Sequence, residues 1–501
     1  MFKLPSVLLV MATLAIAGCG GGGGDEASSP LDEALSYLPA DAPFAVAIDT
    51  DTDGEQYKAA GEIADRFGAR DDLVKQIEDS IDAKPGEIER FEKALGNEFV
   101  VGSTDARAFV TQSGDDDQSF IGTIQAADKE SIDALLEDEG AEQDGESNGA
   151  KLYKDDDGDT FAIKDDVLVV ADTKQRLIKA LETREGDDHL TEEDFDAGTE
   201  GVPSDALIRV YVDIESLLRN DPDTKQALKS KWVDALRTGG IALSVEEDEV
   251  SIDFDIATDP DDLTDEDLPI GAGSEAPEVL QRDGEISVAL RDPQQILQFI
   301  SATAKQVGGA DEISGGLEQV ETAFDVDIEK DLLGQMQDGI AVSVDLGGKI
   351  GARGELKDPK AFEQTLAKVA KVLPKFAEGA TGEKVGFVEP KKGEDFYALA
   401  TPGGDQIVFG VVDGVFVLSN DPKVAGTLAS EDTRTVPGAK GSVALGADAE
   451  QLAQAILGQA GGIGIVDRVK NAIGTKPLDQ LTGSIESSTD GLSGSFKLTL
   501  D

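Results

Sequence analysis

Cysteine and histidine, which many catalytic and metal sites require, are nearly missing from this chain. Its 501 residues include one cysteine, Cys19, and one histidine, His189. A single cysteine excludes an intrachain disulfide. A single histidine in an acidic loop argues against histidine-rich zinc sites and against His-based catalytic triads, and we interpret His189 as a solvated side chain. These shortages, and the lack of a G-x-S-x-G elbow, lead us to expect a protein that is not an enzyme.

Basic and aromatic residues are also scarce. The chain has 44 Lys and Arg against 102 Asp and Glu, a formal net charge of −58. It should therefore not bind nucleic acid, because phosphate contacts need Lys and Arg. Aromatic residues make up only 5% of the chain, which argues against a sugar-binding groove. A hydrolase that uses carboxylates remains a weaker alternative, since acids are plentiful.

The N-terminus has the features of a lipoprotein signal. Lys3 gives a short basic region, and Val7–Ile16 is an apolar run too short to span a membrane as a mature helix. Ile16-Ala17-Gly18-Cys19 resembles a bacterial lipobox, in which the cysteine thiol receives a diacylglycerol. We expect residues 1–18 to be a signal peptide and 19–33 to be lipidated Cys19 with a flexible Gly-rich, acidic tether. The folded part would then lie outside the cytoplasm, anchored to the cell membrane by its N-terminal lipid.

One pattern near the middle of the chain recurs at its end. Gly239–Asp259 and Leu481–Asp501 each alternate apolar and polar residues around a turn, as a β-hairpin with one buried face does. Aligning Ile241 with Gly483 sets an offset of 242 residues (483 − 241), and Phe254 then falls on Phe496. Further blocks of strand and helix pattern repeat in the same order before each hairpin, with offsets that loop insertions explain.

The repeat predicts two homologous halves, residues 34–258 and 283–501, joined by an acidic Pro/Gly linker at 259–282. Strands that follow strands through tight acidic turns indicate a mainly antiparallel sheet with helices packed on it, an α+β fold. Two such halves commonly meet about a pseudo-twofold axis. We expect a cleft or a continuous sheet at that junction, and a ligand there.

Asp49-Thr50-Asp51-Thr52-Asp53-Gly54 matches the first half of a calcium-binding loop. Carboxylates at alternate positions can converge on one hard cation, so Asp49, Asp51 and Asp53 are the candidate calcium ligands. The twelfth position is Ala60, where a bidentate Glu belongs. The alternative is the acid-rich N-terminus of a helix. No other cofactor is expected.

Residues Ser36–Asp49, SYLPADAPFAVAID, are similar to the opening of a bacterial secreted family known as domain of unknown function thirty-three fifty-two. Asp166–Asp172, a strand that ends at a helix, also resembles this family. The resemblance implies an exported, membrane-attached α+β protein and supplies neither an activity nor functional residues. With the lipobox and the duplication, it leads us to expect a non-catalytic binding or scaffolding lipoprotein of the cell envelope. The alternative is a carrier of lipid or another apolar ligand between sheets and helices. The sequence leaves the ligand, the protein partner and the oligomeric state open.

Overall fold

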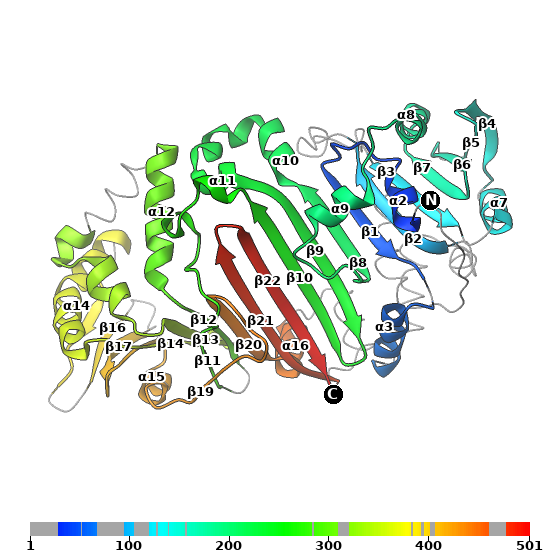
Figure 1. The fold of residues 1–501 in the computed structure, drawn as a ribbon. Helices are drawn as coiled ribbons and strands as arrows, with labels where there is room; N and C mark the ends of the chain where they lie inside the picture. Colours follow the sequence, from blue (N-terminus) through cyan, green and yellow to red (C-terminus); the bar gives the residue numbers. More distant parts are fainter. Residues whose placement is uncertain are drawn as a thin grey trace.

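Figure 1 shows the computed structural model of the chain. It describes residues 29–51, 53–67, 95–104, 120–126, 129–138, 140–155, 158–282, 285–308, 320–381, 384–391, 395–400, 406–459 and 477–501. The sequence pattern also predicts a helical stretch from Asp71 to about Leu95 and a strand at Ala108–Thr111. These segments, like the expected signal peptide and Cys19, lie outside the described residues, except that Leu95 begins a strand.

The described residues form an α+β fold built on one antiparallel sheet of twenty strands. The first ten strands pair in one continuous series, each with its neighbour. In spatial order they are β4 (Glu142–Ser147), β5 (Ala150–Lys154), β6 (Thr160–Lys164), β7 (Val167–Ala171), β3 (Phe120–Ala126), β2 (Leu95–Ser103), β1 (Phe44–Asp49), β8 (Ile208–Asp213), β9 (Leu236–Glu246) and β10 (Glu249–Thr258).

The remaining ten strands form a second series with the same order of pairings. They are β15 (Gly386–Val388), β16 (Phe396–Ala400), β17 (Gln406–Val412), β18 (Val415–Ser419), β14 (Ile350–Glu355), β13 (Ile340–Asp345), β12 (Glu285–Leu290), β20 (Val443–Asp448), β21 (Leu478–Ser488) and β22 (Gly491–Leu500). The two series meet where β10 pairs with β22 over nine residue pairs, so the sheet is continuous at the junction. In Figure 1 these long green and red strands cross the middle of the molecule.

Several helices directly follow a strand and begin at a polar cap. Thr173, Asp213 and Asp421 each accept a backbone hydrogen bond from the first turn of the next helix. The helices are α2 (Pro30–Leu35), α3 (Glu55–Arg66), α7 (Lys129–Asp138), α8 (Lys174–Glu185), α9 (Glu192–Gly198), α10 (Ile214–Asn220), α11 (Lys231–Ala235), α12 (Pro293–Val307), α14 (Pro359–Thr381), α15 (Pro422–Leu428) and α16 (Ala449–Gln459).

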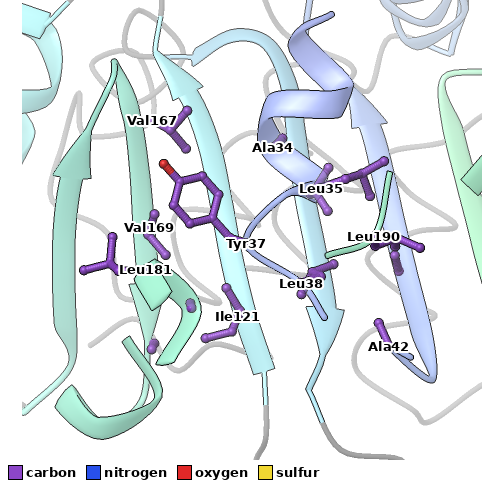
Figure 2. Close-up of a cluster of buried hydrophobic side chains, with 14 of the residues drawn as sticks. Ala34, Leu35, Tyr37, Leu38, Ala42, Ile121, Val167, Val169, Leu181 and Leu190 are labelled. Carbon is purple, nitrogen blue, oxygen red and sulfur yellow. The ribbon is translucent and has the colours of Figure 1, made fainter. Parts of the chain in front are cut away.

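A large core cluster of the first series lies where α2 and α8 cover β3 and β7. Figure 2 shows the Tyr37 ring beside Val167 and Val169, with Ile121 and Leu181 nearby. Tyr37 is fully buried, and its burial raises the pKa of the phenol to about 12. The cluster fixes the outer strands as a rigid support for the centre of the sheet.

Two segments differ from the expectation. The four-residue spacing of Leu228, Trp232 and Leu236 predicts one helix over Asp223–Arg237, but this segment divides into a 3-10 helix (Pro222–Lys229), α11 and the start of β9. Ser230 is extended at φ −73° and ψ 129°, and Leu236 is extended too, because pairing of β9 competes with helix formation. The acidic, Gly-bearing composition of Glu139–Gly149 predicts a loop, but the segment contains β4, because pairing with β5 satisfies its backbone.

The residues between the two series are packed against the fold. Leu263 and Leu268 are buried beside Trp232. Farther along, β11 (Val279–Leu280) pairs with β19 (Thr433–Arg434) and lies over β12 and β13. The acidic segment therefore covers part of the sheet of the second series.

Candidate functional site

The four central strands carry an apolar surface at the junction of the two series. Alternate residues of a strand point to the same face of a sheet, so cross-strand partners share a face. One row across β9, β10, β22 and β21 is Ile241, Phe254, Gly494 and Ile485. The adjacent row on the same face is Leu243, Ile252, Phe496 and Gly483. We call the six large residues of these rows the apolar seam: Ile241, Leu243, Ile252, Phe254, Ile485 and Phe496.

Two phenylalanines lie at the centre of the apolar seam. The ring of Phe254 lies over β22, and the ring of Phe496 lies over β21. Phe254 and Phe496 stack with ring centroids 6.3 Å apart and an interplanar angle of 21°. A Cβ added to Gly494 would lie 2.4 Å from the Phe254 ring, and one added to Gly483 would lie 2.5 Å from the Phe496 ring. The glycines therefore make room for the rings, which extend along the sheet and leave an apolar floor.

Helices cover the ends of the central strands and leave the seam partly open. At one end Tyr57 and Ile63 of α3 pack with Val245 and Val250. At the other end α10 packs on β9, and Trp232 of α11 clusters with Leu492 of β22 (Figure 1). Between these ends Ile241 is 43% exposed and Ile252 is 47% exposed. Adjacent exposed apolar residues on one face are typical of a binding surface.

The opposite face of the same strands is polar and carries small side chains. Asp253 pairs with Ser495, and Ser495 pairs with Ser484. A pocket of about 410 Å³ lies on this face and is lined in part by Asp255, Glu486 and Ser493. Its lining is acidic, so it does not provide the apolar cavity that a closed carrier needs. The apolar surface at the junction is instead the open seam.

The three calcium candidates lie around the end of β1. Asp49 is its last residue, and its Oδ1 accepts a hydrogen bond of 2.8 Å from the backbone N–H of Asp51. Asp51 Oδ1 accepts one of 2.9 Å from the N–H of Asp53. These bonds are typical of Asx turns. In the part of the chain that the structure describes, no group of three or more His, Cys, Asp or Glu is placed to hold a metal ion. Calcium binding here stays a prediction.

His189 lies against the first residues of the fold. It forms an isolated antiparallel bridge with Pro39, and its Nδ1 is 3.0 Å from the carbonyl oxygen of Gly186. This ring contact lies at the exposed surface of the fold. The lipidation residue, Cys19, lies outside the described residues, so lipid attachment stays a prediction.

Glu98 is a residue that the sequence did not single out. It faces Asp49 as a cross-strand partner on β2 and β1. Burial of the carboxyl group raises the pKa of Glu98 from 4.5 to about 8. Repulsion from the carboxylates of Asp49 and Glu192 raises this pKa further, and the positive charge of Arg209 lowers it. Arg209 also lies 5.0 Å from the Phe195 ring centroid and pairs with Asp196 at 2.7 Å. Only the register of β1 with β2 brings Glu98 and Asp49 together. Because the two residues are far apart in the chain, the sequence alone did not predict that they are neighbours.

We expect Glu98→Gln to flatten the pH dependence of stability. Between pH 4.5 and about 8 the folded chain keeps a proton on Glu98 that the unfolded chain loses. The free energy of unfolding therefore falls as pH rises through this window, by at most about 1.4 kcal/mol per pH unit. Urea unfolding from pH 5 to 9 measures the slope, and Glu146→Gln on exposed β4 is the control. Equal slopes for Glu98→Gln and the unmodified protein would show that Glu98 ionises normally.

Helices long and apolar enough to cross a membrane are not found among the described residues.

Comparison with curated proteins gave no match. A family model described as "Protein of unknown function (DUF3352)" matches residues 6–375. Among solved structures, crystal form III of TP0453 is similar at 8% identity and a TM-score of 0.27, covering 46% of this chain and 82% of that one. Crystal form I of TP0453 gives 11% identity, a TM-score of 0.28, and 46% and 80% coverage. Similarity at this level carries no argument about function.

Proposed function

Because the chain belongs to the DUF3352 family of proteins of unknown function, whose description assigns no activity, we propose a function from the apolar seam. The protein is an exported, non-catalytic lipoprotein of the cell envelope that binds the acyl chain of a lipid or a similar apolar ligand on this seam. The observation that carries the proposal is the stacked pair Phe254 and Phe496 beside the exposed Ile241 and Ile252.

The location in this proposal rests on the N-terminal sequence. The lipobox places a diacylglycerol on Cys19, and two or more acyl chains anchor a protein firmly to a membrane. Residues 20–24 are all glycine, which makes a flexible tether between the anchor and the fold. A protein held in this way remains close to a source of lipid. Mass measurement of the mature N-terminus checks the anchor, and an unmodified Cys19 would contradict it.

The duplication is part of the same proposal. The two strand series have the same order of pairings, and each ends in a long hairpin. Where β10 meets β22, Asp253 pairs with Ser495. Ser495 is also the residue that aligns with Asp253 when the second half is shifted by 242 residues onto the first. Phe254 and Phe496, equivalent at the same offset, lie on either side of this point. These features support a pseudo-twofold axis through the junction, so that the seam is built from matching parts of both halves.

The ligand's chemistry follows from the surface. An acyl chain offers apolar area to the seam, and each buried CH₂ group contributes about 0.8 kcal/mol. A neutral head group avoids repulsion by the net charge of −58. The alternative is that the seam binds the apolar surface of a partner protein. In that case the protein acts as a scaffold. The carboxylate-dependent hydrolase is weaker and would rest on the Glu98 and Asp49 pair, in which a protonated acid lies beside a second carboxyl group.

Trp232, the single tryptophan of the chain, is a natural reporter for this proposal. It clusters with Leu492, which faces the same side of β22 as Phe496. A monoacylglycerol brominated along its chain should quench Trp232 fluorescence in a saturable titration, because bromine quenches at short range. The same lipid without bromine should compete. A protein whose fluorescence does not change up to the solubility limit of the lipid would contradict the proposed function.

A further inference from the structure

A second pocket lies on the face of the sheet opposite the apolar seam, over the strands of the second series. Its volume is about 630 Å³, within the range of small-molecule sites. The floor includes Ala289, Ala341 and Arg353 of β12, β13 and β14. Residues 274–278 of the segment between the series form one wall, and residues from 433 to 439 contribute another. Strand pairing places Ala289 on the same face as Ser495, opposite Phe496.

Two arginines line this pocket in different ways. Arg353 is only 8% exposed, and its Nη1 donates a hydrogen bond of 2.6 Å to the carbonyl oxygen of Glu431. Its Nη2 lies 3.3 Å from Glu355 Oε1. Arg291 follows the end of β12, and its Nε is buried without a hydrogen-bond partner. Within the described residues, no ion pair includes Arg291.

Among the described residues, the Nε atoms of three arginines are buried without a hydrogen-bond partner: those of Arg282, Arg291 and Arg434. Arg282 pairs with Glu285 and Glu431, and Arg434 donates to Gln480, whereas no hydrogen bond or ion pair joins the guanidinium of Arg291 to an acceptor among the described residues. A buried donor without a partner is unfavourable. The planar guanidinium of arginine matches a carboxylate through two parallel hydrogen bonds. A carboxylate bound in the pocket would therefore give the guanidinium of Arg291 the ion pair that it lacks within the described residues.

Acidic residues at the same pocket limit the kind of anion that can bind. Glu275, Glu278, Asp338 and Glu355 all contribute to its lining. Four carboxylates repel a doubly charged phosphate group, while they attract an ammonium group. We propose that this pocket binds a short peptide with free termini, whose carboxylate pairs with Arg291 and whose ammonium group lies among the acidic residues. The inference is independent of acyl-chain binding at the seam, because the two sites occupy opposite faces of the sheet.

Calorimetric titration of the full chain with trialanine tests this inference. Trialanine should bind, and trialanine amide, which lacks the carboxylate, should bind at least about tenfold more weakly. N-acetyl-trialanine, which lacks the ammonium group, should also bind more weakly. Inorganic phosphate should not displace trialanine. Equal affinity for trialanine and its amide, tighter binding of phosphate, or no binding of trialanine at millimolar concentration would each overturn the proposal.

The Arg291→Gln variant assigns the carboxylate to its residue. It should bind trialanine at least about tenfold more weakly, while its weak affinity for trialanine amide should not change. Arg219→Gln is the matched control, because Arg219 is an exposed residue of α10 that pairs with Glu215. Full trialanine affinity in Arg291→Gln would overturn the assignment. If that variant does not fold, the comparison of the peptide and its amide on the unmodified protein still decides the proposal.

Discussion

The Ile252→Lys variant is expected to bind a neutral monoacylglycerol at least about tenfold more weakly than the unmodified protein. Ile252 lies between Leu243 and Phe496 at the centre of the apolar seam. An acyl chain seated there would have to desolvate the new ammonium group, and it would also lose apolar contact area. Because Ile252 is 47% exposed, the lysine can reach water in the free protein and the fold should be retained. Quenching of Trp232 by the brominated lipid measures the change.

A matched control is available on an outer strand. Ile407 of β17 is 38% exposed, so Ile407→Lys makes the same substitution away from the junction. We expect this variant to bind the lipid as the unmodified protein does. If Ile252→Lys also binds normally, the acyl chain lies elsewhere and the seam is not its site. If both variants lose binding equally, the effect comes from added charge and not from position.

The Gly491→Ala variant is expected to lower the free energy of unfolding by about 3 kcal/mol. Gly491 begins β22 opposite Ala257 of β10, at a φ of 154°. An added Cβ would lie 2.1 Å from the carbonyl oxygen of Ile256, which is backbone and cannot rotate away. The clash should separate the strands at one end of the junction. Urea unfolding measures the loss of stability, and the lipid titration should show weaker binding.

Gly426→Ala is the control for this substitution. Gly426 lies inside α15, and a Cβ added there meets nothing within 4 Å. The free energy of unfolding should therefore stay the same or rise by up to about 1 kcal/mol, because alanine favours helix more than glycine does. A Gly491→Ala protein as stable as the unmodified one would mean that the β10 and β22 junction is looser than its register indicates.

The sequence predicted the strands of the junction well, because periodicity carries local information. Ile241, Leu243, Ile252 and Phe254 alternate with small or polar residues, and the pattern returns around Phe496. The alternation also placed them on one face of a sheet. It could not show that β10 pairs with β22, or that this face is left partly open. Both depend on where α3, α10 and α11 pack, which follows from the whole fold.

The charged features depended even more on the tertiary structure. Glu98 and Asp49 are 49 residues apart in the sequence (98 − 49), and only the register of β1 with β2 makes them partners. Arg291 became notable because residues 274–278 fold back over β12 and β13 and enclose its pocket. From composition, residues 259–282 were expected to be a linker between the two halves. Leu268, which is buried, and the short strand β11 hold this linker against the fold.

Native mass spectrometry of the protein, purified from its own host and freed of its covalent anchor, tests the central claim most directly. If the seam is a binding site for acyl chains, the protein should retain a noncovalent adduct with the mass of a lipid, and Ile252→Lys should lose it. A chelator should leave this adduct in place, and loss of about 40 Da on chelation would identify calcium as a separate ligand. A protein that carries no lipid mass, or carries the same lipid in Ile252→Lys, would contradict the assignment of the seam.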